Sequence, residues 1–472
     1  MIRIFRLSGT AATGLTLLRK ANAVQTALLG GLAILFFLGT GFASPTDTEA
    51  QTERGIAQRS SFKFSFGEKH RRGFTRITPD TDYTTQRGYG LMSTRSLGTN
   101  AKSLCGGNAL FRFTVDVPEG NYDVKLTMGG GQNESITTVK AESRRLFLPR
   151  VVVASRKFAT RTFTVNVRHK ELMNGDIVRI KKDEESDFDW DHSLTLEFSN
   201  AHPCVSSLEI QKNERAITVY IAGDSTVTDQ RREPWAAWGQ MLPRFFKAGV
   251  AIANHAESGE SLKSFTGENR LAKLLERMKP GDYLFVQFAH NDQKPGTFHV
   301  DSFTTYKEYL KQYINQARTR RAIPVLVTSM HRRRFDDAGK IINTLDAYPE
   351  AMRQLAREQN VALIDLNAMS KILFEALGPE GTLQAFVHYP AHTFPGQDEE
   401  LKDDTHFNEY GAYELARCVV KGIQQSNLAL KKYLRKDVGH LEPAKPDPPN
   451  LLFTALESWK GAIFRTPLLV RP

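Results

Sequence analysis

Two patterns of hydrophobic and polar residues divide the chain. Between residue 62 and about residue 212, apolar residues alternate with polar ones in short runs that are separated by turn signals. Alternation with a period of two is typical of half-buried β-strands. Several short strands at this spacing predict an all-β sandwich over residues 61–212. The expected strands are 62–66, 110–117, 122–126, 163–167, 177–180, 194–198 and 205–210.

Past Arg215 the pattern changes to apolar runs that alternate with segments of helical periodicity. This alternation predicts one α/β domain with a parallel sheet over residues 215–430. The expected strands are 217–222, 250–254, 283–288, 323–329 and 361–366, and the expected helices are 235–247, 262–278, 304–318, 349–358 and 409–423.

The two ends of the chain differ from these domains. Residues 1–43 carry early basic residues and then an uncharged run over 27–42 that ends in Gly41-Phe42-Ala43, which is typical of a secretory signal peptide. The run approaches the length that spans a bilayer, so an uncleaved membrane anchor is the alternative. In either case we expect the protein to be exported: secreted, periplasmic or held at the cell surface.

Residues 44–60 are polar and form a predicted linker. The tail, residues 431–472, is basic and then proline-rich, and 451–464 has the spacing of a short amphipathic helix.

Composition narrows the class of protein. With 40% hydrophobic and 24% charged residues the chain is globular. The formal net charge of +11 is compatible with an acidic substrate, and the absence of zinc-finger spacing and of an aromatic-basic repeat argues against nucleic acid. Of the three cysteines, Cys105 and Cys204 fall in the same predicted domain and form the favoured pair; three free thiols are the alternative.

Ser225 is the first candidate for chemistry. It follows the apolar run 217–222 in the sequence Gly223-Asp224-Ser225, where a buried strand is expected to end in a tight turn. Ligands of open α/β sheets bind outside the carboxyl ends of the strands. Ser225 is therefore a candidate nucleophile, although such a tripeptide taken alone is only a strand-ending turn.

Three later blocks supply what a serine nucleophile needs. A serine requires a histidine base oriented by a carboxylate, and Asp403 and His406 lie three residues apart. The oxyanion of the intermediate requires converging donors. The backbone N–H groups of Ser225 and Gly259 and the side-chain amide of Asn291 are the candidates.

Together these blocks resemble the SGNH (GDSL) hydrolase superfamily and, within it, the rhamnogalacturonan acetylesterases. The resemblance covers about residues 215–425. It rests on Gly223-Asp224-Ser225-Thr226, Trp238-Gly239-Gln240, Asn254-x-Ala256-x-x-Gly259-x-Ser261, His290-Asn291-Asp292, Arg332-Arg333-Arg334-Phe335 and Asp403-x-Thr405-His406-Phe407. It implies a flavodoxin-like three-layer α/β domain. The stretch 118–124 and the strand 205–210 resemble galactose-binding-like jelly rolls, which places such a domain before the α/β domain.

The resemblance implies roles for individual residues. Ser225 is the expected nucleophile, His406 the base and Asp403 its orienting carboxylate, with Asp404 as the competitor. Four further residues are candidate substrate contacts, each with a structural alternative. His290 and Asp292 contact substrate or support the turn, and Trp238 lines a sugar groove or belongs to the core. Arg333 binds uronate carboxylates through its bidentate donors or lies in a solvated basic loop. Glu260 departs from the pattern, because an arginine often stands at its position, and this departure concerns sugar specificity.

The sequence therefore predicts an exported carbohydrate esterase that removes O-acetyl groups from an acidic, pectic polysaccharide, without a metal or a cofactor. Two alternatives stay open. One is an SGNH esterase or lipase of another specificity, and the other is a glycan-binding surface protein whose esterase domain is vestigial.

Overall fold

The computed structural model describes residues 60–66, 71–92, 104–105, 110–394 and 396–449. The predicted signal segment, most of the predicted linker and the helix expected at 451–464 lie outside these residues. Within them, no helix combines the length and the apolar character needed to cross a bilayer.

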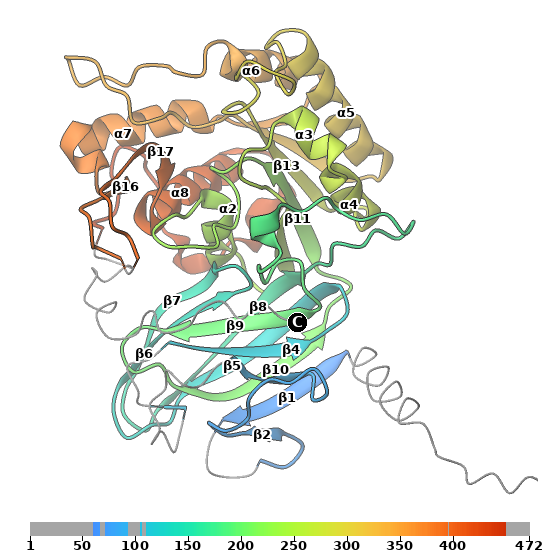
Figure 1. Cartoon of the computed structure of the whole chain (residues 1–472), viewed down its shortest axis with the longest axis vertical. Coiled ribbons are helices and arrows are strands. Elements are labelled where there is room, and N and C mark those ends of the chain that lie inside the picture. Colours follow the sequence, from blue (N-terminus) through green and yellow to red (C-terminus); the bar gives the residue numbers. More distant parts are fainter. Residues whose placement is uncertain (1–59, 67–70, 93–103, 106–109, 395, 450–472) are drawn as a thin grey trace, which may run out of the picture. The chain divides into compact units, whose positions relative to one another are not determined.

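The N-terminal part of the described chain consists of two five-stranded β-sheets (Figure 1). One has the order β2-β1-β10-β5-β8 and the other β3-β4-β9-β6-β7, and every pairing except β1–β2 is antiparallel. Their inner faces share one apolar core, in which the Phe64 and Phe113 rings lie 4.8 Å apart. The strands are β1 (Ser61–Phe66), β2 (Thr75–Ile77), β3 (Tyr89–Met92), β4 (Phe111–Asp116), β5 (Gly120–Gly129), β6 (Ser135–Ala141), β7 (Arg145–Val153), β8 (Phe158–Val167), β9 (Ser193–Ser199) and β10 (Val205–Lys212).

This β domain matches the prediction of an antiparallel two-sheet domain, and its jelly-roll type stays a prediction. The strand expected at 177–180 was wrong. Ile177 makes only an isolated bridge to Glu171, because the apolar residues here pack into a small separate cluster with Leu172 and Trp190. The segment between β8 and β9 also contains the short 3-10 helix η2 (Lys182–Glu184).

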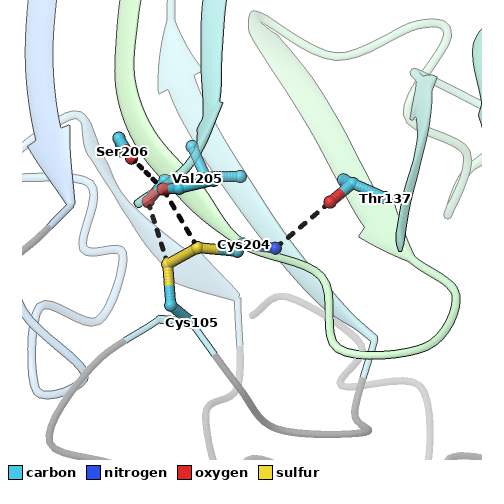
Figure 2. The surroundings of a disulfide bond; sticks show 6 residues. Cys105, Thr137, Cys204, Val205 and Ser206 are labelled. Carbon is cyan, nitrogen blue, oxygen red and sulfur yellow. Dashed lines mark hydrogen bonds between the residues drawn. A yellow bond between two sulfur atoms is a disulfide. The ribbon is translucent and has the colours of Figure 1, made fainter. Parts of the chain in front are cut away.

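A disulfide bond joins Cys105 to Cys204 within the β domain (Figure 2). The Cys204 backbone N–H donates to Thr137 Oγ1 at 3.2 Å, which ties the bridge to β6. The favoured cysteine pair is thereby confirmed. Cys418 is buried and unpaired.

The C-terminal part is an α/β domain around a parallel sheet of order β12-β11-β13-β14-β15. Numbered by appearance, this is the order 2-1-3-4-5 of flavodoxin-like folds. The strands are β11 (Ile217–Gly223), β12 (Val250–Asn254), β13 (Tyr283–Gln287), β14 (Ile323–Val327) and β15 (Ala362–Ile364).

Helices cover both faces of this sheet, which gives three layers (Figure 1). Val219 and Ile221 of β11 pack with α2, α7 and α8, whereas Tyr220 and Ala222 pack with α3, α4, α5 and α6. The helices are α2 (Trp238–Met241), α3 (Leu262–Gly267), α4 (Arg270–Glu276), α5 (Thr305–Thr319), α6 (Tyr348–Glu358), α7 (Leu366–Thr382) and α8 (Glu409–Gln425).

Two expected helices are shorter than predicted. The one at 235–247 is α2 followed by the 3-10 helix η3 (Leu242–Phe245), and the one at 262–278 is divided into α3 and α4 at Asn269, whose φ is 63°. Helix α7 and the hairpin of β16 (Phe386–Tyr389) and β17 (Leu401–Phe407) were not predicted.

Candidate active site

Ser225 lies directly after β11, at the carboxyl edge of the sheet, and is 9% exposed. Asp224 shapes the turn that presents it: its Oδ1 accepts from Thr226 N at 2.9 Å and from Thr226 Oγ1 at 2.7 Å. A Cβ on Gly223 would lie 2.7 Å from Val227 Cγ2, so only glycine fits there. Asp224 thus stabilises the turn that carries Ser225.

His406 links Ser225 to a carboxylate. Its Nε2 lies 2.8 Å from Ser225 Oγ, and its Nδ1 lies 2.7 Å from Asp403 Oδ2. Asp403 Oδ1 accepts the backbone N–H groups of Thr405 and His406, both at 2.9 Å, and Trp235 Nε1 lies 3.4 Å from Oδ2. The three residues form a continuous Ser–His–Asp hydrogen-bonded chain.

Electrostatics keep the Asp403 carboxylate ionised. Partial burial alone would raise its pKa, but the hydrogen bond and charge of His406 outweigh burial, and the two backbone donors add to them. The pKa of Asp403 is therefore held well below its usual range. An ionised carboxylate at this position stabilises a protonated histidine ring.

The β16–β17 hairpin explains why Asp403, and not its neighbour, faces His406. Phe386 pairs with Phe407 and Val387 pairs with Asp403, so three residues of β17 have no partner on β16 and form a bulge. The bulge brings Asp403 and His406 to the same side. Asp404 instead contacts Arg333 at 3.2 Å and His388 at 2.9 Å.

The three candidate oxyanion donors come from the ends of three adjacent strands. β11 pairs with β12 on one side and with β13 on the other, and Ser225, Gly259 and Asn291 lie in the loops that follow these strands. Gly259 is exposed and has a φ of 81°. Asn291 is oriented by Lys294 Nζ, which donates to its Oδ1 at 2.7 Å, while its Nδ2 donates to the Glu260 carbonyl at 2.9 Å.

Three of the four candidate substrate contacts have buried side chains, which favours the structural alternative predicted for each of them. Trp238 is 0% exposed and donates from Nε1 to Gln287 Oε1 at 2.9 Å within the core. His290 is 2% exposed, and burial lowers its pKa well below the usual value. Asp292 is 0% exposed and accepts from Leu262 N at 2.9 Å, which braces the start of α3.

Arg333 also has internal partners. Beyond Asp404, it donates to Thr382 Oγ1 at 3.2 Å and to the Pro379 carbonyl at 3.0 Å. Its guanidinium group therefore braces the hairpin against α7, and its substrate contact remains a prediction.

Sequence reasoning missed one side chain at this site, Lys181. It comes from the β domain, forms an ion pair with Glu260 Oε1 at 2.6 Å and donates to the Ser258 carbonyl. Periodicity and motifs within residues 215–430 carry no signal for it, since it belongs to the other domain.

One group of side chains in the described part of the chain has the composition of a metal site. His169, Glu171 and His192 of the β domain offer ligand atoms within 4.8 Å of one another. The His169 and His192 rings lie 4.0 Å apart, and His192 Nε2 lies 3.9 Å from Glu171 Oε2.

Comparisons with known proteins identify the class to which this fold and site belong. The GDSL-like lipase/acylhydrolase family matches residues 221–413. The rhamnogalacturonan acetylesterase RhgT of Bacillus subtilis (strain 168) is 44% identical over 224 residues, which cover 47% of this chain and 95% of RhgT. The chain belongs to the GDSL/SGNH acylhydrolases and is a serine esterase related to rhamnogalacturonan acetylesterases.

A longer match includes the β domain. The uncharacterized esterase YxiM of the same organism is 27% identical over 397 residues, covering 79% of this chain and 93% of YxiM. A crystal structure of the B. subtilis YxiM protein covers 78% of this chain and 99% of its own, at 25% identity and a TM-score of 0.43.

Proposed function

We propose that this esterase removes acetyl groups from a rhamnogalacturonan-like pectic polysaccharide by acyl transfer through Ser225. The observation that carries the chemistry is His406, which contacts Ser225 Oγ and Asp403 Oδ2 at once. The substrate class is supported by the relationship to RhgT and, at 38% identity over 223 residues, to the probable rhamnogalacturonan acetylesterase YesY of B. subtilis.

In the first half-reaction Ser225 Oγ attacks the acetyl carbonyl carbon, and His406 Nε2 takes the hydroxyl proton. Asp403 stabilises the imidazolium that forms. The Ser225 and Gly259 N–H groups and the Asn291 amide stabilise the oxyanion of the tetrahedral intermediate. His406 then protonates the departing sugar oxygen, which leaves an acetyl-Ser225 ester.

In the second half-reaction a water molecule replaces the sugar. His406 removes a proton from the water as it attacks the acetyl carbonyl carbon, and then returns that proton to Ser225 Oγ. Acetate leaves, and the hydroxyl group of Ser225 is restored.

The location of the enzyme is part of the proposal. The uncharged run 27–42 after basic residues supports export, and a disulfide is characteristic of oxidising compartments. Because pectic polymers lie outside cells, an exported enzyme would meet its substrate. Cell fractionation combined with mass determination of the mature N-terminus would distinguish a cleaved signal from a retained anchor.

The substrate class is tested by acetate release from a panel of acetylated rhamnogalacturonan, acetylated homogalacturonan, acetylated xylan and 4-nitrophenyl butyrate. We expect the highest kcat/KM with acetylated rhamnogalacturonan. A clear preference for xylan or for the longer acyl ester would contradict the proposed specificity. Binding of acetylated glycan with no turnover on any substrate would favour a vestigial esterase.

A further inference from the structure

The loop that carries Gly259 is held from two sides. Asn291 Nδ2 donates to the Glu260 carbonyl at 2.9 Å, from the end of β13. From the β domain, Lys181 Nζ donates to the Ser258 carbonyl and pairs with the Glu260 carboxylate at 2.6 Å. A Cβ added to Gly259 would lie 3.5 Å from Lys181 Nζ, so the ammonium group lies directly against this glycine.

Glu260 places a carboxylate beside Gly259, and this carboxylate needs a cation as its partner. Its side chain is 1% exposed, and its second oxygen accepts from Ser264 Oγ at 2.6 Å. A buried carboxylate that lacks a cation is strongly unfavourable. A negative charge one residue from a proposed oxyanion donor would also oppose the negative charge that develops in the transition state. Lys181, whose side chain is 33% exposed, supplies the ammonium group that pairs with Glu260.

Lys181 is itself held in place by a buried network. Its N–H donates to Glu184 Oε2 at 2.7 Å, and Glu184 N donates back to the Lys181 carbonyl at 2.9 Å. Glu184 accepts from Arg270 Nη1 on α4 and from Trp190 Nε1, both at 3.0 Å. The segment around η2 is therefore anchored to the α/β domain before any substrate binds.

We infer that Lys181 is a positioning residue of the active site, by which the β domain holds the Ser258–Glu260 loop and neutralises Glu260. In this arrangement Lys181 keeps the Gly259 N–H directed at the oxyanion, and the inference rests on the proposed acyl transfer at Ser225. The β domain then has a direct function in catalysis, in addition to any affinity for glycan.

The test compares Lys181→Met with wild type on 4-nitrophenyl acetate, a neutral substrate without sugar. We expect kcat to fall by about 10- to 100-fold with KM within about twofold, since loss of a whole oxyanion donor costs about 10²–10³. Lys182→Met is the matched control, because Lys182 is the exposed neighbour on η2, and its kcat should stay at the wild-type value.

A double variant separates charge from packing. Lys181→Met with Glu260→Gln removes both members of the ion pair, so we expect kcat to recover to within about threefold of wild type. Lys181→Arg keeps the charge and should retain most of the activity.

Two results would overturn the inference. One is a lowered melting temperature in Lys181→Met with unchanged kcat at 25 °C, which is the behaviour of a purely structural residue. The other is an unchanged kcat on 4-nitrophenyl acetate together with a raised KM for acetylated rhamnogalacturonan, measured in parallel, which is the behaviour of a substrate contact. Because 4-nitrophenyl acetate carries no sugar, failure of the proposed pectic specificity alone would leave this measurement unaffected.

Discussion

At the scale of single residues, Asp403 and not Asp404 contacts His406, and two backbone N–H groups hold its carboxylate in place. Asp403 receives two N–H groups and contacts His406 Nδ1 at 2.7 Å, whereas its neighbour Asp404 pairs with Arg333 and His388. The spacing of three residues between Asp403 and His406 indicated this choice from the sequence. The bulge that brings Asp403 and His406 to the same side of β17 could not be predicted, because it depends on how β17 pairs with β16.

The two aspartates therefore predict opposite outcomes on substitution. Asp403→Asn should lower kcat for acetyl esters by about 10³–10⁴-fold, because the amide favours the wrong histidine tautomer. Asp404→Asn is the matched control and should stay within a few-fold of wild type. Comparable losses in the two variants would contradict the assignment of Asp403.

Asp292 makes the stability of the protein depend on pH, because burial raises the pKa of its carboxyl group to about 8. An unfolded aspartate titrates near pH 3.9, at about its ordinary value. Between about pH 4 and pH 8 the folded protein therefore binds more protons at this site than the unfolded chain. The contribution of Asp292 to stability falls as the pH rises through this window.

As the pH rises from 5 to 8, we expect the unfolding free energy of Asp292→Asn to fall less than that of wild type. One proton accounts for up to about 1.4 kcal/mol per pH unit. The amide oxygen can still accept from Leu262 N, so the start of α3 is preserved. Urea denaturation at several pH values measures the slope, with the exposed Asp337→Asn as control. Equal slopes in all three proteins would exclude a titrating Asp292.

At the scale of elements, α8 positions the hairpin that carries Asp403 and His406. The helix begins after Asn408, whose side chain accepts from Gly411 N at 3.1 Å. A Cβ on Gly411 would lie 2.0 Å from the Ala385 carbonyl oxygen, just before β16. This close approach requires glycine and fixes the distance between helix and hairpin.

Gly411→Ala should therefore push α8 away from the hairpin. We expect a loss of about 1–3 kcal/mol in unfolding free energy, as for other overpacked sites, together with a reduced kcat. Gly381→Ala in α7 is the control, because the nearest atom to its added Cβ is Leu377 Cβ at 3.5 Å. If both variants unfold and react like wild type, the packing argument fails.

The elements themselves were predicted unevenly. The five strands of the parallel sheet were found near their observed positions because buried strands are continuous apolar runs. β6 and β7 were missed: their pairing is irregular between Thr137 and Lys140, and β7 contains Pro149, which argues against a strand. α7 contains Gly378 and Pro379, so its helical pattern is interrupted.

At the scale of the whole molecule, the sequence indicated two domains but not their contact. Ion pairs between residues far apart in the chain link the domains: Arg145 to Asp229 at 3.3 Å, Arg231 to Asp187 at 2.7 Å, and Lys181 to Glu260. Such ion pairs do not alter the hydrophobic periodicity of either segment, so the sequence pattern does not reveal them. The hydrogen-bonded chain of Ser225, His406 and Asp403 could be found from motifs, whereas the β-domain segment that contacts the Gly259 loop could not.

The Cys105–Cys204 bridge closes a loop with a sequence separation of 99 residues. In the chain-entropy model a loop of this length contributes about 4–5 kcal/mol. We expect reduction by dithiothreitol to lower the melting temperature while leaving kcat at 25 °C near the wild-type value, because the bridge lies in the β domain. A Cys105→Ala/Cys204→Ala variant should be insensitive to the reductant. Equal melting temperatures of wild type with and without reductant would contradict a stabilising bridge.

The central claim is that Ser225 carries the acyl group, and acetate release by Ser225→Ala tests it most directly. The assay uses acetylated rhamnogalacturonan, with near-ultraviolet circular dichroism to verify the fold. Ser155→Ala, at an exposed serine of the β domain, is the matched control. We predict that Ser225→Ala keeps the wild-type spectrum and loses at least about 10³-fold in kcat, since a residual rate remains without a nucleophile. Acetate release by a folded Ser225→Ala at the rate of Ser155→Ala would contradict the account.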